Sequence, residues 1–178
     1  MKFIVFSDLH VEDYPSYNKA PYSRLDDTLS VLKQVFKIAA EKYAAILFAG
    51  DLVDKASSLK AHVVTDLYEC FKECFNIYED TKFFCISGNH DLTTRNLVHG
   101  EAKSIMPLFH DNFDNFYCLD TYELGYFLIK EKVQVQGVPF YDKRELWLKH
   151  LEAAKETKEQ GYFNILLTHQ TDTTQPRP

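Results

Sequence analysis

The stretch "KFFCISGNHD", Lys82 to Asp91, sets an apolar run directly against a polar turn. Residues 83–86 are all apolar, which is typical of a buried strand, and residues 87–91 follow as Ser-Gly-Asn-His-Asp. A polar loop would explain this ending, because Gly, Asn and Asp are common turn formers. A set of ligands held at the carboxyl end of a strand would also explain it. The endings of the other strands decide between the two interpretations.

Apolar strands and amphipathic helices alternate over the first half of the chain. Strands are predicted at residues 2–6, 44–50 and 82–87, and helices at residues 23–43 and 59–78. Continuous apolar strands separated by amphipathic helices favour parallel strands that are covered on both faces. The first helix opens with Ser and carries Asp three residues later, a spacing that indicates a capping box.

The pattern changes in the second half of the chain. Residues 116–140 contain three shorter strand candidates with little room for helices, which indicates antiparallel additions. A charged helix is predicted at residues 142–160 and a buried strand at 162–169, followed by a polar tail at 170–178. We therefore predict a single domain over residues 1–178, an α/β layered sandwich of mixed sheets flanked by helices.

Composition narrows the class of protein. The net charge of −6 argues against a protein that coats nucleic acid through a generally basic surface. The four cysteines form no CxxC pair. No apolar run approaches 18 residues, so a membrane span is not expected. The apolar run at the N-terminus is too short for a signal peptide. A reducing cytoplasm is the expected location.

Polar side chains follow four of the predicted strands. They are, in chain order, Asp8 and His10, Asp51 and Asp54, Asn89, His90 and Asp91, and finally His169. In an open α/β sheet, ligands bind outside the carboxyl ends of the strands. A single Asp or His in such a place is usually a turn or structural residue, but the coincidence at four strand ends favours a shared site. Oxygen and imidazole ligands without a thiolate suit a pair of divalent ions better than a structural zinc site.

Two of these positions indicate how ions would be held. Asp8 and His10 are separated by one residue, and on an extended segment they would point the same way and grip one ion. Asp51 has two carboxylate oxygens and can bridge two ions about 3.5–4 Å apart, the spacing of two-metal hydrolases. Asp54 either orients a metal ligand or caps the following helix.

The motifs SDLH (7–10), GDLVD (50–54), SGNHD (87–91) and LLTHQ (166–170), in this order, resemble the calcineurin-like metallophosphoesterase superfamily. The resemblance covers residues 1–170 and implies the layered fold of that family, with its metal site at the strand ends. It also implies hydrolysis of a phosphoester by in-line attack of water that two divalent ions activate. The implied metal ligands are Asp8 and His10 for the first ion, Asp51 as the bridge, and Asn89 and His169 for the second ion.

The same resemblance gives His90 a catalytic role rather than a ligand role. It implies that His90 protonates the leaving oxygen or stabilises the transition state, with Asp91 as the residue that orients it. The family's final G-H-x-H motif is absent after His169. We therefore expect a chain that is truncated before this motif and lacks the last strands of the fold. Such a chain would bind metal weakly and be poorly active.

Two further segments are similar to SbcD-type DNA-repair nucleases of bacteria or phages. They are GDLVDKASS (50–58) and VQVQGVPFYDKRE (133–145), the second with a G-[LVI]-P-[YF] turn after a strand. This similarity implies DNA as substrate, Mn²⁺ ahead of Mg²⁺, Fe²⁺ or Zn²⁺, and an SbcC-type coiled-coil ATPase as partner. It implies a role in DNA repair or recombination, in the cytoplasm or in a host cytoplasm if phage-encoded. A homodimer stays open, because proteins of this type commonly dimerise.

Two other functions stay open at this point. One is a cyclic-nucleotide or small-molecule phosphodiesterase of the same superfamily, and the other is a non-catalytic scaffold with this fold. His99 follows the third motif closely, which makes it a candidate to approach the substrate beside the metal ligands. Lys143, Arg144 and Lys149 either contact a nucleic-acid backbone or form the solvated face of a charged helix.

Overall fold

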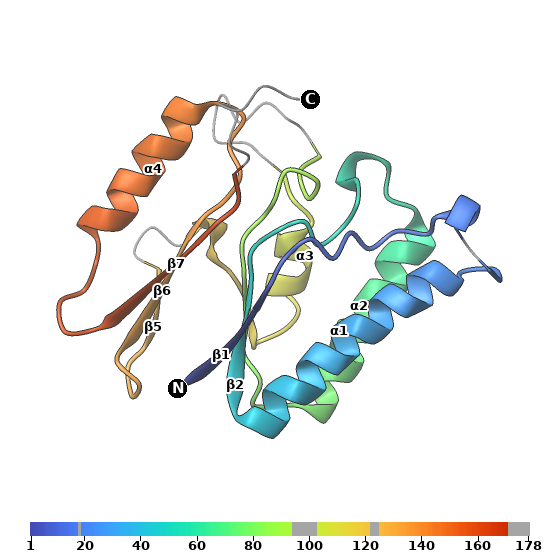
Figure 1. Cartoon of the computed structure of the whole chain (residues 1–178), viewed down its shortest axis with the longest axis horizontal. Helices are drawn as coiled ribbons and strands as arrows, with labels where there is room; N and C mark the ends of the chain where they lie inside the picture. Colours follow the sequence, from blue (N-terminus) through green and yellow to red (C-terminus); the bar gives the residue numbers. More distant parts are fainter. Residues whose placement is uncertain (18, 94–102, 122–124, 171–178) are drawn as a thin grey trace.

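The computed structural model describes residues 1–17, 19–93, 103–121 and 125–170, and Figure 1 shows their arrangement. The strands are β1 (Lys2–Phe6), β2 (Ala44–Phe48), β3 (Phe83–Cys85), β4 (Phe116–Cys118), β5 (Tyr126–Leu128), β6 (Val133–Val138) and β7 (Phe163–Thr168). The helices are α1 (Ser23–Lys42), α2 (Ala61–Ile77), α3 (Met106–His110) and α4 (Arg144–Glu156), with short 3-10 turns at Pro15–Tyr17, Ala56–Ser58 and Leu119–Thr121. The predicted elements are therefore present, with ends that differ by a few residues.

The strands form two sheets. The first has the order β1-β2-β3-β4 with every pair parallel, and the second has the order β5-β6-β7. Within the second sheet β5 and β6 are antiparallel, whereas β6 and β7 are parallel. The expectation of antiparallel additions is thus correct for β5 with β6 and wrong for β4. The segment between β3 and β4 contains α3, so β4 returns to the sheet in the same direction as β3.

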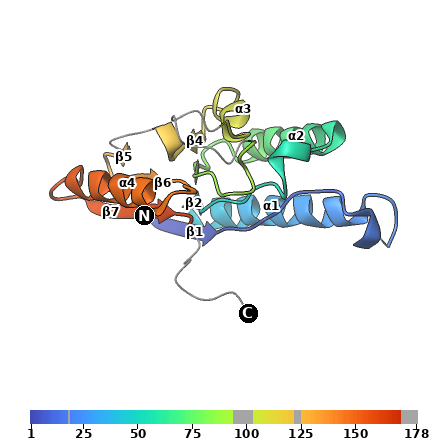
Figure 2. The ribbon, with the colours of Figure 1, turned by 90° about the horizontal axis from the view of Figure 1, so that it is seen from above.

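The first sheet separates two apolar cores. Alternate side chains of β2 point to opposite faces, so Ile46 and Phe48 pack against α1 and α2, while Ala45 and Leu47 pack against the second sheet. Figures 1 and 2 show α1 and α2 on one side of the first sheet, and β5–β7 with α4 on the other. The parallel strands are therefore covered on both faces, as predicted, by helices on one face and by a sheet on the other.

Two strands that were predicted to be buried are edge strands. β1 and β7 each lie at one edge of their sheet, as β4 and β5 do at the other edges, and Val5 and Phe163 are 63% and 68% exposed. Their apolar sequences resemble those of central strands, and only the strand order separates the two cases. Cys70 and Cys74 are buried in the core on α2, as their helical spacing predicts. No helix within the described ranges is long and apolar enough to cross a membrane.

The helices agree with the predicted periodicity more closely at their centres than at their ends. The expected capping box at Ser23 is wrong: the N-cap is Tyr22 in a left-handed conformation, with no side-chain cap. The Ser23 hydroxyl oxygen instead accepts the backbone N–H of Lys19 at 3.0 Å. Only Ala154 of α4 is buried. The buried side chain of Gln134 donates to the Thr157 carbonyl oxygen at the C-terminal end of this helix.

Candidate metal centre

The loops after β1 and β2 are tied together by backbone hydrogen bonds. The N–H of Asp8 donates to the Gly50 carbonyl oxygen at 3.0 Å, and the N–H of His10 donates to the Asp51 carbonyl oxygen at 3.1 Å. These bonds continue the parallel pairing of β1 and β2 past the ends of both strands. They bring the first two sequence motifs side by side at one edge of the sheet.

The backbone at Asp8 and His10 is not extended, so the predicted reason for their pairing is wrong. Their φ angles are 58° and 49°, in the left-handed region that a residue with a side chain seldom adopts. The hydrogen bonds to the β2 loop hold the chain in this conformation. The two side chains still meet, because His10 Nε2 lies 3.7 Å from Asp8 Oδ1.

Asp51 lies at the centre of the site and is only 3% exposed. Its Oδ1 accepts the backbone N–H of His90 at 3.0 Å, while its Oδ2 lies 3.7 Å from His10 Nε2 and 3.4 Å from His169 Nε2. Burial on its own would raise the pKa of Asp51, but the contact with His169 and the N–H of His90 outweigh it. The net result is a pKa below the ordinary value, so this carboxylate stays charged.

His169 and Asn89 meet on one side of Asp51. His169 donates its Nδ1–H to the Ala49 carbonyl oxygen at 2.7 Å, which turns Nε2 toward Asp51 and toward Asn89 Oδ1 at 3.3 Å. Burial on its own would lower the pKa of His169. The nearby Asp51 carboxylate and the Ala49 carbonyl outweigh this effect, so the pKa of His169 lies above its ordinary value. The residue predicted from the late strand therefore reaches the site of the first three motifs.

His90 faces the same space from the third loop. Its ring stands edge-on to that of His10, with centroids 4.7 Å apart, and its Nδ1 hydrogen-bonds the Asp54 carbonyl oxygen. Ligand atoms of His10, Asp51 and His90 all lie within 4.8 Å of one another. Position alone therefore makes His90 a further candidate ligand beside its predicted catalytic role.

Asp91 does not orient His90 as predicted. It is fully buried, and its carboxylate accepts the backbone N–H groups of Asp51 at 2.9 Å, Val53 at 3.0 Å and Gly88 at 2.9 Å. Burial raises the pKa of Asp91 to about 7, against the opposing effect of these backbone N–H groups. Asp91 is thus a structural residue that fastens the third loop to the second loop.

Asp54 belongs to the surroundings of the site, as one of its two predicted roles requires. Its Oδ1 lies 3.6 Å from His10 Nδ1, and its carbonyl oxygen holds His90. The alternative role, as a helix cap, is not supported, because Lys55 and Lys60 occupy the N-cap positions of the two helical segments that follow. Tyr14 also hydrogen-bonds the Asp54 carboxylate; burial, followed by this contact, raises the pKa of Tyr14.

Two glycines permit the close approach of the loops. A Cβ on Gly88 would lie 2.1 Å from Asp51 Oδ1, and one on Gly50 would lie 2.7 Å from His169 Nδ1. Sequence reasoning treated both only as turn residues. It also missed Asp120, whose Oδ1 accepts the backbone N–H of Ser87 at 2.9 Å, because an isolated Asp after β4 carries no motif.

Other histidines lie away from the centre. His62 on α2 lies 3.6 Å from Asp13, and His150 on α4 stacks on Tyr141 with centroids 4.6 Å apart. Neither is among the residues that surround Asp51. The predicted role of His99 lies outside the described residues, and so does residue 171 onward of the predicted polar tail.

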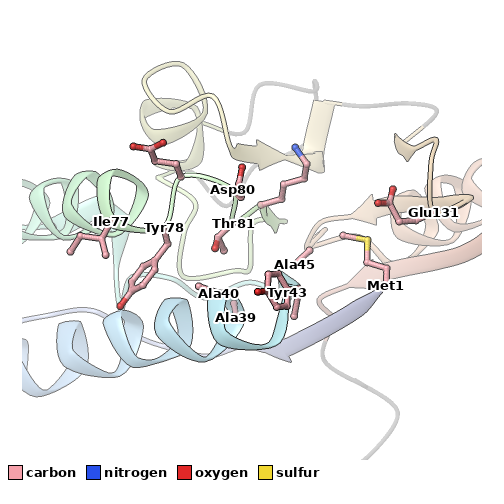
Figure 3. Close-up of a pocket in the computed structure, with 13 residues that line it drawn as sticks. Met1, Ala39, Ala40, Tyr43, Ala45, Ile77, Tyr78, Asp80, Thr81 and Glu131 are labelled. Carbon is pink, nitrogen blue, oxygen red and sulfur yellow. The ribbon is translucent and has the colours of Figure 1, made fainter.

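A separate hollow lies at the opposite edge of the first sheet. It has a volume of about 510 Å³ and is lined by residues that include Met1, Tyr43 and Tyr78, which Figure 3 shows around its rim. These residues flank the amino ends of β1, β2 and β3, whereas every motif residue follows a carboxyl end. The hollow therefore takes no part in the site.

The residues present fit divalent metal ions. Carboxylate oxygens and imidazole nitrogens follow one another at 3.4–3.7 Å, from Asp8 to His10, from His10 to Asp51 and from Asp51 to His169. The buried Nδ1 of His10 has no hydrogen-bond partner among the described residues, although Asp54 Oδ1 is 3.6 Å away. A buried acidic centre ringed by imidazoles is the donor set of a borderline divalent cation rather than of an anion.

Comparison with known proteins agrees with this geometry. The calcineurin-like phosphoesterase family matches residues 1–177, nearly the whole sequence. A search of curated proteins found no match. The fold, with a parallel sheet flanked by helices and the motif residues at its carboxyl edge, is consistent with this family. The chain belongs to the calcineurin-like phosphoesterase family, and so to the metal-dependent phosphoester hydrolases.

Proposed function

We propose that the protein is a metal-dependent phosphodiester hydrolase that cleaves DNA, a nuclease subunit of the SbcD type acting in repair or recombination. The observation that carries the hydrolase part is the group of Asp8, His10 and His169 around the buried carboxylate of Asp51. Asn89 beside His169 is a further residue of this chain that would hold two divalent ions, with Mn²⁺ the expected species.

The ions would supply Lewis acidity toward the phosphoryl oxygens and the attacking water when bound. The chain's own residues would position the reacting groups and protonate the leaving oxygen. The Asp54 carbonyl accepts Nδ1–H of His90, so Nε2 of the imidazolium is the atom that can give a proton to the leaving oxygen. Asp91 keeps the loop of His90 in place through backbone N–H groups rather than through the ring.

The proposal of DNA as substrate rests on the motif Gly137-Val138-Pro139-Phe140 that resembles SbcD-type nucleases. Its turn lies against the third metal-site loop, because the N–H of Phe140 donates to the Ser87 carbonyl oxygen at 3.0 Å. Gly137 allows this approach, since a Cβ there would lie 2.6 Å from both Ile86 and Leu119. An SbcC-type coiled-coil ATPase is the partner that this similarity proposes.

A panel of substrates with Mn²⁺ tests the proposal. Linear duplex DNA, single-stranded DNA, cyclic AMP and an aryl phosphodiester are incubated with wild type and with Asp51→Asn. The proposal predicts cleavage of DNA and of the aryl ester that Asp51→Asn and EDTA abolish. Cleavage of cyclic AMP without cleavage of DNA would replace the nuclease assignment by a small-molecule phosphodiesterase. Absence of all turnover and of Mn²⁺ binding would leave a non-catalytic scaffold.

A further inference from the structure

A second hollow opens directly beside the metal centre. Its volume is about 900 Å³. The residues that line it are His10, Tyr14, Lys19, Ser23, Arg24, Asp27 and Asp54. It shares His10 and Asp54 with the metal centre, so a ligand whose reacting group lies at the ions would extend into it. We name it the Lys19–Arg24 hollow.

The cations of this hollow come from one short segment at the start of α1. Lys19 and Arg24 are exposed, and the Ser23 hydroxyl oxygen accepts the backbone N–H of Lys19 at 3.0 Å. The N–H of Ala20 approaches the same oxygen at 3.4 Å. These bonds fix the chain that carries Lys19 against the first turn of the helix that carries Arg24.

The two carboxylates of the hollow have different surroundings. Asp54 Oδ1 lies 3.6 Å from His10 Nδ1, and its carboxylate accepts a hydrogen bond from Tyr14. Asp27 is exposed on α1, three residues after Arg24. The Lys19–Arg24 hollow is therefore lined at the start of α1 by Lys19, Arg24 and Asp27, and by Asp54 on the side of the metal centre.

Two cations in a hollow that adjoins the metal centre suit a ligand with more than one phosphate. An Arg guanidinium matches phosphate oxygens in a bidentate manner, and a Lys ammonium binds them as a point charge. The net charge of the whole chain is −6, so an anionic strand would need local cations to stay near the site. About 900 Å³ is near the upper end of the ~300–1,000 Å³ range of small-ligand pockets, which leaves room for more than a single phosphate group.

We propose that Lys19 and Arg24 bind a neighbouring phosphate of a single DNA strand while its scissile phosphate lies at the metal centre. They are specificity-determining residues, which select a strand over a small phosphodiester that has only one phosphate. This inference rests on the proposed function and names how that site recognises its substrate.

Binding without metal tests the inference apart from catalysis. A fluorescein-labelled 12-nucleotide single strand is titrated with protein in EDTA at several salt concentrations, and anisotropy gives the affinity. For the double variant Lys19→Ala/Arg24→Ala we expect weaker binding. We also expect the slope of log K against log[salt] to be shallower by about 1.4, because each lost phosphate contact to a single strand reduces it by about 0.7. Lys37→Ala, an exposed lysine further along α1, is the matched control and should bind as wild type does.

Kinetics with Mn²⁺ supply the second arm. The double variant should raise KM for the oligonucleotide at least about tenfold and leave hydrolysis of bis(p-nitrophenyl) phosphate unchanged, because that ester has no second phosphate. Lys19→Gln/Arg24→Gln should behave alike, which separates loss of charge from loss of fold.

The two arms separate the inference from the function on which it rests. If wild type hydrolyses neither substrate, the proposed function fails, while the EDTA titration still decides the inference. The inference would be overturned if the double variant bound the oligonucleotide with the affinity and the salt slope of wild type. An equal loss of turnover on the one-phosphate ester would also overturn it, because the two residues would then act on the metal centre itself.

Discussion

Replacing Gly88 by Ala should disrupt the contact between the second and third loops and destabilise the protein. A Cβ on Gly88 would lie 2.1 Å from Asp51 Oδ1 and 2.5 Å from the Asp51 backbone nitrogen. The carboxylate cannot simply rotate away, because it accepts the N–H of His90 and lies beside two imidazoles. Overpacking costs about 1–3 kcal/mol when side chains can adjust. We expect about 3 kcal/mol here, because one of the clashing atoms belongs to the backbone.

Gly161→Ala is the matched control. Gly161 has a φ of 82°, and a Cβ there would meet no atom within 4 Å. Its substitution carries only left-handed strain of about 1–2 kcal/mol, partly offset by the lower entropy of the unfolded chain, for a net effect of about 1 kcal/mol. The Gly→Ala change thus introduces a steric clash at Gly88 and only backbone strain at Gly161, so the difference in stability between the two variants reports the clash.

Thermal unfolding in EDTA, followed by circular dichroism, measures both variants without a contribution from metal. About 3 kcal/mol corresponds to a fall in Tm of about 6–12 °C in a chain of this size. Calorimetric titration with Mn²⁺ should also show weakened binding in Gly88→Ala and unchanged binding in Gly161→Ala. A Gly88→Ala protein that melts within 2 °C of wild type and binds Mn²⁺ normally would refute the reasoning.

Three other substitutions test separate parts of the structure. His90→Ala should lower kcat about 10²–10⁴-fold while Mn²⁺ affinity by calorimetry stays near that of wild type; a large loss of affinity would make His90 a ligand. His169→Ala should weaken Mn²⁺ binding at least about tenfold, because its Nε2 faces both Asp51 and Asn89; unchanged affinity would remove it from the ligand set. Gln134→Ala should cost about 2 kcal/mol in urea unfolding, because its amide bonds the Thr157 carbonyl and the Glu159 N–H at the end of α4; a change below about 0.5 kcal/mol would contradict that role.

The convergence of the motif residues was predictable because each motif follows an apolar strand. A parallel sheet brings its carboxyl ends to one edge, so the sequence order of Asp8, Asp51 and Asn89 becomes spatial proximity without further information. The meeting of His169 with Asn89 does not follow from this rule alone, because β7 belongs to the second sheet and the packing of the two sheets brings its carboxyl end to this edge.

The contacts that were predicted wrongly depend on distant backbone. Asp8 and His10 adopt left-handed angles because the β2 loop holds their N–H groups, and period-two alternation does not apply to such a chain. Asp91 was assigned to His90 because the family resemblance implies that role. Its actual donors include Asp51 and Val53, about 40 residues earlier, which only the folded chain brings near.

Strand direction and strand burial depend on the same kind of non-local information. The short apolar run of β4 reads like part of a meander, and its parallel direction follows from the connection through α3. β7 is as apolar as a central strand, yet it is the outer strand of the second sheet. Local pattern therefore predicts the elements, while their order in a sheet comes from the packing of the whole chain.

The central claim is that the Asp51 centre carries out metal-dependent phosphodiester hydrolysis. Release of p-nitrophenolate from bis(p-nitrophenyl) phosphate, measured with and without Mn²⁺ for wild type and Asp51→Asn, tests it most directly. The account predicts turnover that requires Mn²⁺, disappears with EDTA and is absent from Asp51→Asn. Turnover that persists in Asp51→Asn or in EDTA would contradict it, as would a wild type that binds Mn²⁺ at this centre and hydrolyses no phosphodiester.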